Sequence, residues 1–187
     1  MARIRFVDTE TAEPEVAGVL RRVEKNGARV INIHRMLGNS SAVLDPFLTL
    51  GNSLLTKAKL EARLREMAIM RVATLSGSQY EWQQHRALSL AVGVTESQLA
   101  DLAHWQDSGA FDAKDRAVLA YVDEVIQNVS VSDATFANLR NYFDETEIVE
   151  LTVSIGFWRA AAHLLVALEV DLEEGAGAGV SDILGKS

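Results

Sequence analysis

The chain has 187 residues, enough for one domain with a full hydrophobic core, and its 48% apolar and 24% charged residues exclude an intrinsically disordered chain. A net charge of −8 without any basic cluster argues against a nucleic-acid-binding protein. The sequence contains no cysteine, which excludes disulfides, thiolate metal sites and thiol-based redox chemistry.

Helical periodicity dominates the chain, and no segment alternates as a half-buried strand would, so we expect an all-α fold. In chain order, apolar spacing and capping residues predict helices at about 14–27, 31–38, 45–55, 57–75, 78–92, 95–105, 113–128, 132–142 and 145–173. Residues 1–174 should form a single helical domain, and the glycine-rich segment 175–187 should be a flexible tail.

The most apolar stretch, residues 151–170, has about the length of a membrane span. Arg159, His163 and Glu169 interrupt it, and such charges are costly inside a bilayer. We therefore expect a buried helix rather than a membrane contact. Because the first residues lack an apolar signal segment, we also expect a cytoplasmic protein.

The predicted helix 57–75 carries apolar stripes on two opposite sides. Arg71 falls inside one stripe, and Glu66 lies in the middle of the other. A helix that is apolar on two sides is packed between other elements, so both charged side chains should be removed from bulk water. Each then needs a partner.

The stretch SGSQYEWQQH, residues 76–85, places Glu81 and His85 one helical turn apart, on a face that continues with Leu88 and Val92. The short turn before this helix should make it antiparallel to the preceding one, which allows Glu66 to lean toward His85. A cluster of two carboxylates and one imidazole in a water-poor pocket could transfer protons near neutral pH.

Two other interpretations of this cluster stay open. The three side chains could form a satisfied polar network that only fixes helix packing, since Glu and His four residues apart are common on helices. They could also bind a metal ion, but carboxylate-bridged helical bundles repeat a Glu-x-x-His motif that this chain lacks. We therefore expect neither a metal nor another cofactor.

The last predicted helix places Thr152, Gly156, Arg159 and His163 on one face. Small residues around one arginine and one histidine could line a cavity for an anion, because guanidinium groups match carboxylates. Alternatively, Arg159 and His163 could pair with acidic residues at a subunit interface.

The stretch LREMAIMRVATLSGSQYEWQQHRALSLAVGVTESQLADL, residues 64–102, resembles the carboxymuconolactone decarboxylase family, which includes the alkylhydroperoxidase D-like proteins. The matching features are Arg65-Glu66, the segment SGSQYEWQQH, and a glycine turn followed by a capped helix. Looser similarity extends over most of residues 30–170. The resemblance implies an all-helical fold around an antiparallel helix pair, and assembly into homo-trimers or homo-hexamers.

The peroxidase branch of that family carries a Cys-x-x-Cys-x-x-x-His motif with an upstream glutamate. In this chain Ser78 and Glu81 occupy the two cysteine positions, whereas His85 and Glu66 match the other two. Without a thiol there is no sulfenic acid and no peroxide turnover of that kind. The sequence therefore resembles the cysteine-free, decarboxylase-like branch.

The resemblance leads us to expect cofactor-independent acid–base chemistry on a small organic acid or lactone, most simply decarboxylation of a carboxylated lactone in aromatic catabolism. His85 would donate or shuttle the proton, Glu81 would orient it, and Glu66 would act as a buried acid or second partner. The candidate substrate-binding residues are Ser78, Trp82, Arg71, Arg159 and His163.

The same groups could instead serve a lactone hydrolase or isomerase, and the rival from another class is a non-catalytic oligomeric binding or scaffold protein. An enzyme should show His85 lining a cavity of about 300 Å³ or more. A scaffold should show His85 sealed and fully hydrogen-bonded.

Overall fold

The computed structural model describes residues 1–173 of the chain. This part is helical and contains no strand, so the expected all-α fold is confirmed. The predicted tail at 175–187 lies outside the described residues. The helices are α1 (Pro14–Lys25), α2 (Asn32–Leu37), α3 (Ser41–Thr56), α4 (Ala62–Ser76), α5 (Gln79–Ala91), α6 (Glu96–Asp101), the 3-10 helix η1 (Leu102–Asp107), α7 (Ala113–Asn128), α8 (Asp133–Arg140) and α9 (Glu145–Ala167).

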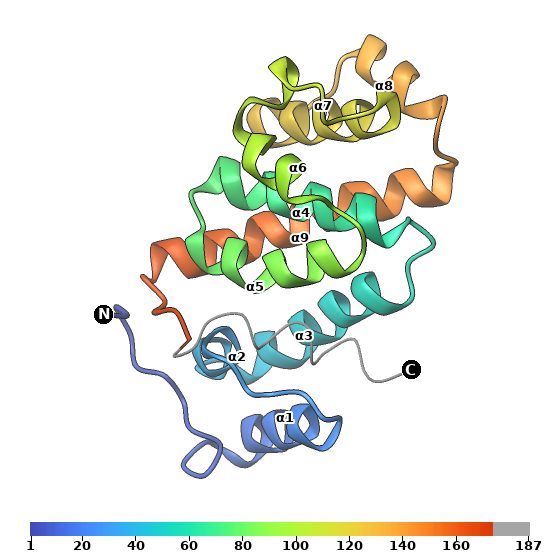
Figure 1. The fold of residues 1–187 in the computed structure, drawn as a ribbon. Coiled ribbons are helices and arrows are strands. Elements are labelled where there is room, and N and C mark those ends of the chain that lie inside the picture. Colours follow the sequence, from blue (N-terminus) through green and yellow to red (C-terminus); the bar gives the residue numbers. More distant parts are fainter. Residues whose placement is uncertain (174–187) are drawn as a thin grey trace.

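Helix α4 lies at the centre of the molecule, where it packs against α5, α7 and α9 (Figure 1). Helices α1, α2 and α3 form a layer on one side of this centre, and α7 and α8 lie on the opposite side. The antiparallel pair expected from the sequence is α4 with α5, joined at Gly77, whose positive φ of 62° ends α4.

Several helix boundaries differ from the predicted ones. Helix α3 begins at Ser41 rather than at 45 and contains Pro46, and the predicted helix 95–105 is divided into α6 and η1. Helix α4 begins at Ala62 rather than at 57, because the backbone N–H of Leu60 donates to the side chain of Glu150 on α9 instead of entering a helix. Helix α9 ends at Ala167 rather than at 173, because Glu169 adopts a positive φ of 50°. The N–H of Val170 then returns to the carbonyl of Leu165, which closes the helix end.

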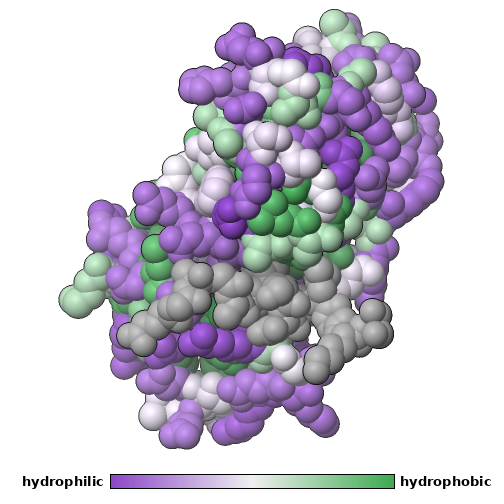
Figure 2. All heavy atoms as spheres, viewed as in Figure 1, coloured by the Kyte–Doolittle hydropathy of each residue, from purple (hydrophilic) through white to green (hydrophobic). Residues whose placement is uncertain are grey.

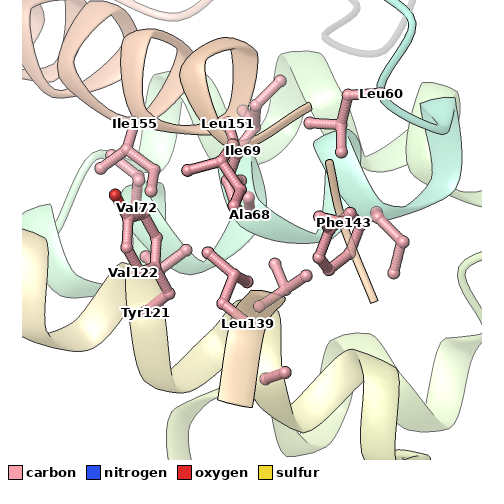
Figure 3. Packing of buried hydrophobic residues seen from close by; sticks show 14 of the residues in the cluster. Leu60, Ala68, Ile69, Val72, Tyr121, Val122, Leu139, Phe143, Leu151 and Ile155 are labelled. Atoms are coloured by element: carbon pink, nitrogen blue, oxygen red, sulfur yellow. The ribbon is translucent and has the colours of Figure 1, made fainter. Parts of the chain in front are cut away.

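The central core lies between α4, α7 and α9 (Figure 3). Ile69 and Val72 of α4 pack there against Val122 of α7 and Ile155 of α9. Every residue of α4 from 64 to 73 is buried, as the two opposite apolar stripes predicted. The polar side chains of α4 are therefore held rigidly in the interior.

Helix α9 is the only helix of the described chain that is long and apolar enough to cross a membrane. Its inner face, which includes Leu151, Ile155 and Trp158, is buried in the core. Its outer face leaves Val149 61% and Val153 41% exposed. The surface seen in Figure 2 is hydrophilic over most of its area, with apolar residues gathered near the middle, around α5 and α6.

Candidate active site

A cavity of about 320 Å³ lies between the α1–α3 layer and the helices α5 and α9. Its wall is mostly apolar and includes Ile33, Phe47, Leu48, Phe157, Ala161 and Leu165. Gly51 also lines it, and a Cβ at this position would lie 2.8 Å from Cζ of Phe157, so a larger residue would have to displace the Phe157 ring. A pocket of this size fits a small organic molecule.

His85 lines the cavity, yet both of its ring nitrogens are already hydrogen-bonded. Its Nδ1 lies 2.9 Å from Oε2 of Glu66, and its Nε2 accepts the indole N–H of Trp158 at 2.9 Å. Because an indole nitrogen can only donate, His85 is the neutral tautomer with its proton on Nδ1, which donates to Glu66. His85 thus lines a cavity, as expected for an enzyme, and both of its ring nitrogens are hydrogen-bonded, as expected for a scaffold protein.

Glu66 is completely buried behind His85. One of its carboxylate oxygens is the His85 partner, whereas Oε1 has no hydrogen-bond partner and lies 4.0 Å from Nε of Arg65. Glu66 is absent from the cavity wall, so it holds His85 in place from the side of the core. The expected convergence of the two side chains across the helix pair is present.

Glu81 is the carboxyl group that lies in the cavity wall. Glu81 is only 3% exposed, and neither of its carboxylate oxygens has a hydrogen-bond partner. Burial raises the pKa of Glu81 from 4.5 to about 7, and the nearby Ser78 hydroxyl and the charge of Arg159 lower it by less. A carboxyl that titrates near neutral pH and is not tied to the protein can give or take a proton.

The hydrogen bonds around His85 differ from the arrangement suggested by the sequence. The sequence suggested that His85 donates the proton and that Glu81 orients it. In the structure Glu66 and Trp158 orient His85, and the unbound carboxyl is Glu81. Trp158 makes the difference, because its buried indole N–H needs an acceptor and finds it on His85.

Of the three candidate anion-binding residues, none lines the cavity. Arg71 makes a bidentate ion pair with Asp123 at 2.7 and 2.9 Å inside the core, away from the cavity wall. Arg159 donates to Ser76 and acts on Glu81 only through its charge, and His163 is exposed. The helix wheel could not separate these cases because it shows faces and not neighbours.

Ser78 and Trp82 flank the site without entering it. Ser78 is the buried N-cap of α5, and its hydroxyl accepts the backbone N–H of Glu81 at 3.5 Å. Trp82 is half-buried and packs against an apolar cluster that contains Met67 and Leu99, away from the cavity wall. Ser78 therefore contacts the backbone of Glu81, and neither Ser78 nor Trp82 lines the cavity.

Gln84, Tyr80 and His34 are among the polar residues of the cavity wall that were not predicted from the sequence as site residues. Gln84 is buried with its Oε1 unpartnered, and Tyr80 donates to Glu173 at 2.6 Å while accepting the N–H of Ile33. His34 reaches the wall from α2. Gln84 could have been found, because it lies on the same face of α5 as Glu81, but His34 depends on how α2 packs.

No group of three or more His, Asp or Glu side chains within residues 1–173 is arranged to hold a metal ion. The metal site left open by the sequence would use Glu66, Glu81 and His85. His85 offers no free nitrogen to a metal because Glu66 and Trp158 occupy both.

The comparisons with known proteins agree with this architecture. The model of the carboxymuconolactone decarboxylase family matches residues 41–124, which include Glu66, Glu81 and His85. No curated protein matches the sequence.

Several solved structures share the fold. An uncharacterized peroxidase-related protein from Ralstonia eutropha, described as an alkylhydroperoxidase AhpD core, is 14% identical with a TM-score of 0.81 over 96% of both chains. A peroxidase-related protein from a Silicibacter species is 16% identical with a TM-score of 0.78, covering 96% of this chain and 95% of its own. The debrominase Bmp8, in a cysteine-to-alanine variant bound to 2,3,4-tribromopyrrole, is 16% identical with a TM-score of 0.72, covering 97% of this chain and 96% of its own. At these identities the likeness shows the fold.

Proposed function

We propose that the cavity is the active site of a cofactor-independent proton-transfer enzyme, because the carboxymuconolactone decarboxylase family model matches residues 41–124 and the chain contains no cysteine. The proposed substrate is a small organic acid or lactone. The observation that carries the proposal is Glu81, a buried carboxyl without hydrogen-bond partners in the wall of an apolar cavity, with its pKa raised to about 7.

Decarboxylation of a carboxylated lactone is the first reaction to consider. The bond between the ring carbon and the carboxylate breaks, carbon dioxide leaves, and the electron pair is delocalised onto the lactone carbonyl as an enolate. The protonated Glu81 then gives its proton to the ring carbon and regains one from water. The apolar wall excludes water from the enolate during this step.

A second candidate, isomerisation of an uncharged lactone or ketone, is favoured by where the cations lie. The two cationic side chains in the cavity wall, Arg22 and Lys57, are exposed and therefore sit at its mouth, and Arg22 pairs with Asp45. A substrate carboxylate deep in the cavity would contact no lysine or arginine side chain, although the charge of Arg159 acts on Glu81 from behind the wall. An uncharged substrate avoids this cost, and the ionised Glu81 would then remove a proton as the base.

The pH dependence of turnover separates the two reactions. A decarboxylase needs the protonated Glu81, so its kcat should fall about tenfold per pH unit above pH 7. An isomerase needs the ionised group, so its kcat/KM should rise up to pH 7 and then level off. Lactone acids and related keto acids would be screened for carbon dioxide release, and uncharged enolisable lactones for isomer formation. Turnover without any transition between pH 6 and 8 would contradict the assignment of Glu81.

We further propose that the protein is a homo-trimer or homo-hexamer, which rests on the exposed apolar residues of α9. Val149→Glu combined with Val153→Glu should reduce the mass measured by light scattering to that of one chain, while the helical circular-dichroism signal stays constant. The control is Thr146→Glu, which adds a negative charge at an exposed polar position of the same helix. A wild-type chain that is monomeric at every concentration would refute the proposal. A cytoplasmic location also remains a proposal.

A further inference from the structure

His34 is a polar side chain of the cavity wall that the proton transfer described above does not use. It is the third residue of α2, it is buried, and it lines the same cavity as Glu81 and His85. Its Nδ1 accepts the backbone N–H of Ile31 at 3.4 Å. His34 therefore carries its proton on Nε2, and no hydrogen bond within residues 1–173 uses that N–H.

The ring of His34 is held in the neutral state. A second proton would have to sit on Nδ1, where it would face the N–H of Ile31. Burial acts in the same direction and lowers the pKa of His34 to about 4. At neutral pH His34 is thus a hydrogen-bond donor with a fixed tautomer, which adds no charge to the cavity.

The cavity wall therefore presents two complementary groups, an N–H donor from α2 and an unbound carboxyl from α5. We propose that His34 donates its Nε2–H to the carbonyl oxygen of the substrate and stabilises the oxygen anion of the enolate formed next to Glu81. This inference rests on the proposed function and narrows the substrate class to carbonyl compounds that form an enolate. When the enolate forms, the electron pair left on the substrate carbon is delocalised onto this oxygen. When Glu81 protonates the carbon, the pair returns to form the C–H bond.

A structural role of His34 makes a different prediction. The side chain also satisfies the backbone N–H at the start of α2, a capping role that a glutamine at the same position can fill. Glutamine also keeps an N–H donor, whereas leucine provides neither group. His34→Gln and His34→Leu therefore form a matched pair, and thermal unfolding of both variants measures the contribution of the cap.

The probe is 4-nitrophenol, a small aromatic ring with an oxygen that mimics the enolate and whose ionisation is visible in its absorbance. Binding of 4-nitrophenol requires no turnover, so this result does not depend on the proposed reaction. The proposed reaction is tested separately, by the pH dependence of turnover. A hydrogen bond to an ionised oxygen is worth about 1.5–3 kcal/mol, so His34→Leu should weaken binding roughly 10- to 150-fold. His34→Gln should stay within about threefold of the wild type.

The wild-type protein gives a second readout that does not depend on a variant folding. The 15N signal of His34 Nε2 is assigned as the one that disappears in His34→Gln. It should shift when 4-nitrophenol binds, whereas a purely capping role of His34 would leave it unchanged. The inference is overturned if 4-nitrophenol does not bind, if both variants bind it as the wild type does, or if the Nε2 signal does not move.

Discussion

Replacing Glu81 with glutamine should reduce kcat by about 10²- to 10⁴-fold, the usual contribution of a positioned acid or base. Glutamine has nearly the same shape and still fits the cavity wall, but it cannot transfer a proton. The measurement is steady-state turnover of the substrate identified by the screen. Retention of full activity would show that Glu81 is not the proton-transfer group.

The same substitution should stabilise the fold at alkaline pH. The pKa of Glu81 is 4.5 ordinarily and about 7 in the folded protein, so the folded state binds the proton more tightly than the unfolded state. Wild-type stability is therefore lost as pH rises from about 4.5 to about 7. Glu81→Gln does not lose this stability, because glutamine does not ionise. We expect the free energy of unfolding of the variant to exceed that of the wild type by about 3 kcal/mol above pH 7.5, with no such difference below about pH 4.5.

Urea unfolding at pH 5 and at pH 8.5 measures this difference. Glu10→Gln, which changes an exposed carboxyl in a turn, is the control and should alter the free energy of unfolding by less than about 0.5 kcal/mol at either pH. A variant at position 81 that is less stable than the wild type at pH 8.5 would mean that the Glu81 charge is well solvated or paired.

Replacing His85 with alanine should destabilise the protein by about 3–5 kcal/mol. The substitution leaves Glu66 buried without its partner and removes the acceptor of the Trp158 indole N–H. From the sequence alone we would expect lost turnover with an intact fold. The structure revises that expectation, because His85 holds α4, α5 and α9 together. Chemical unfolding followed by circular dichroism measures the effect.

Two further variants separate the contributions of the His85 partners. Trp158→Phe keeps an aromatic ring against the cavity but removes the N–H and part of the buried ring, so it should cost about 1 kcal/mol for the hydrogen bond and a further amount for the lost packing. Combining Glu66→Gln with His85→Ala should cost less than the sum of the single changes, since no buried charge is left alone. If His85→Ala is as stable as the wild type, the network does not hold the helices.

The sequence predicts the helical fold well because its local signals agree with the packing. Gly77 and the cap residues mark the helix ends, and the two apolar stripes of α4 predict that it is buried on all sides. Two of the boundaries that differ, at Ala62 and Ala167, are set by a contact with Glu150 and by the backbone turn at Glu169. Neither is a property of the local sequence.

The site is predicted only in part. The wheel places Glu81 and His85 on one face and brings Glu66 near them, and the structure shows the same arrangement. It cannot show that Trp158 binds the free nitrogen of His85 from a helix 73 residues further along the chain. For the same reason the wheel leaves Arg71 as a candidate, although Asp123 already occupies its guanidinium group.

The most direct measurement of the central claim is the titration of the Glu81 carboxyl itself. In protein labelled with 13C at the glutamate carboxyl carbon, the signal missing from Glu81→Gln identifies this group. Its chemical shift should change with an apparent pKa of about 7. A midpoint between pH 4 and 5 would show a carboxylate that is already ionised and solvated, and it would contradict the proposed proton transfer.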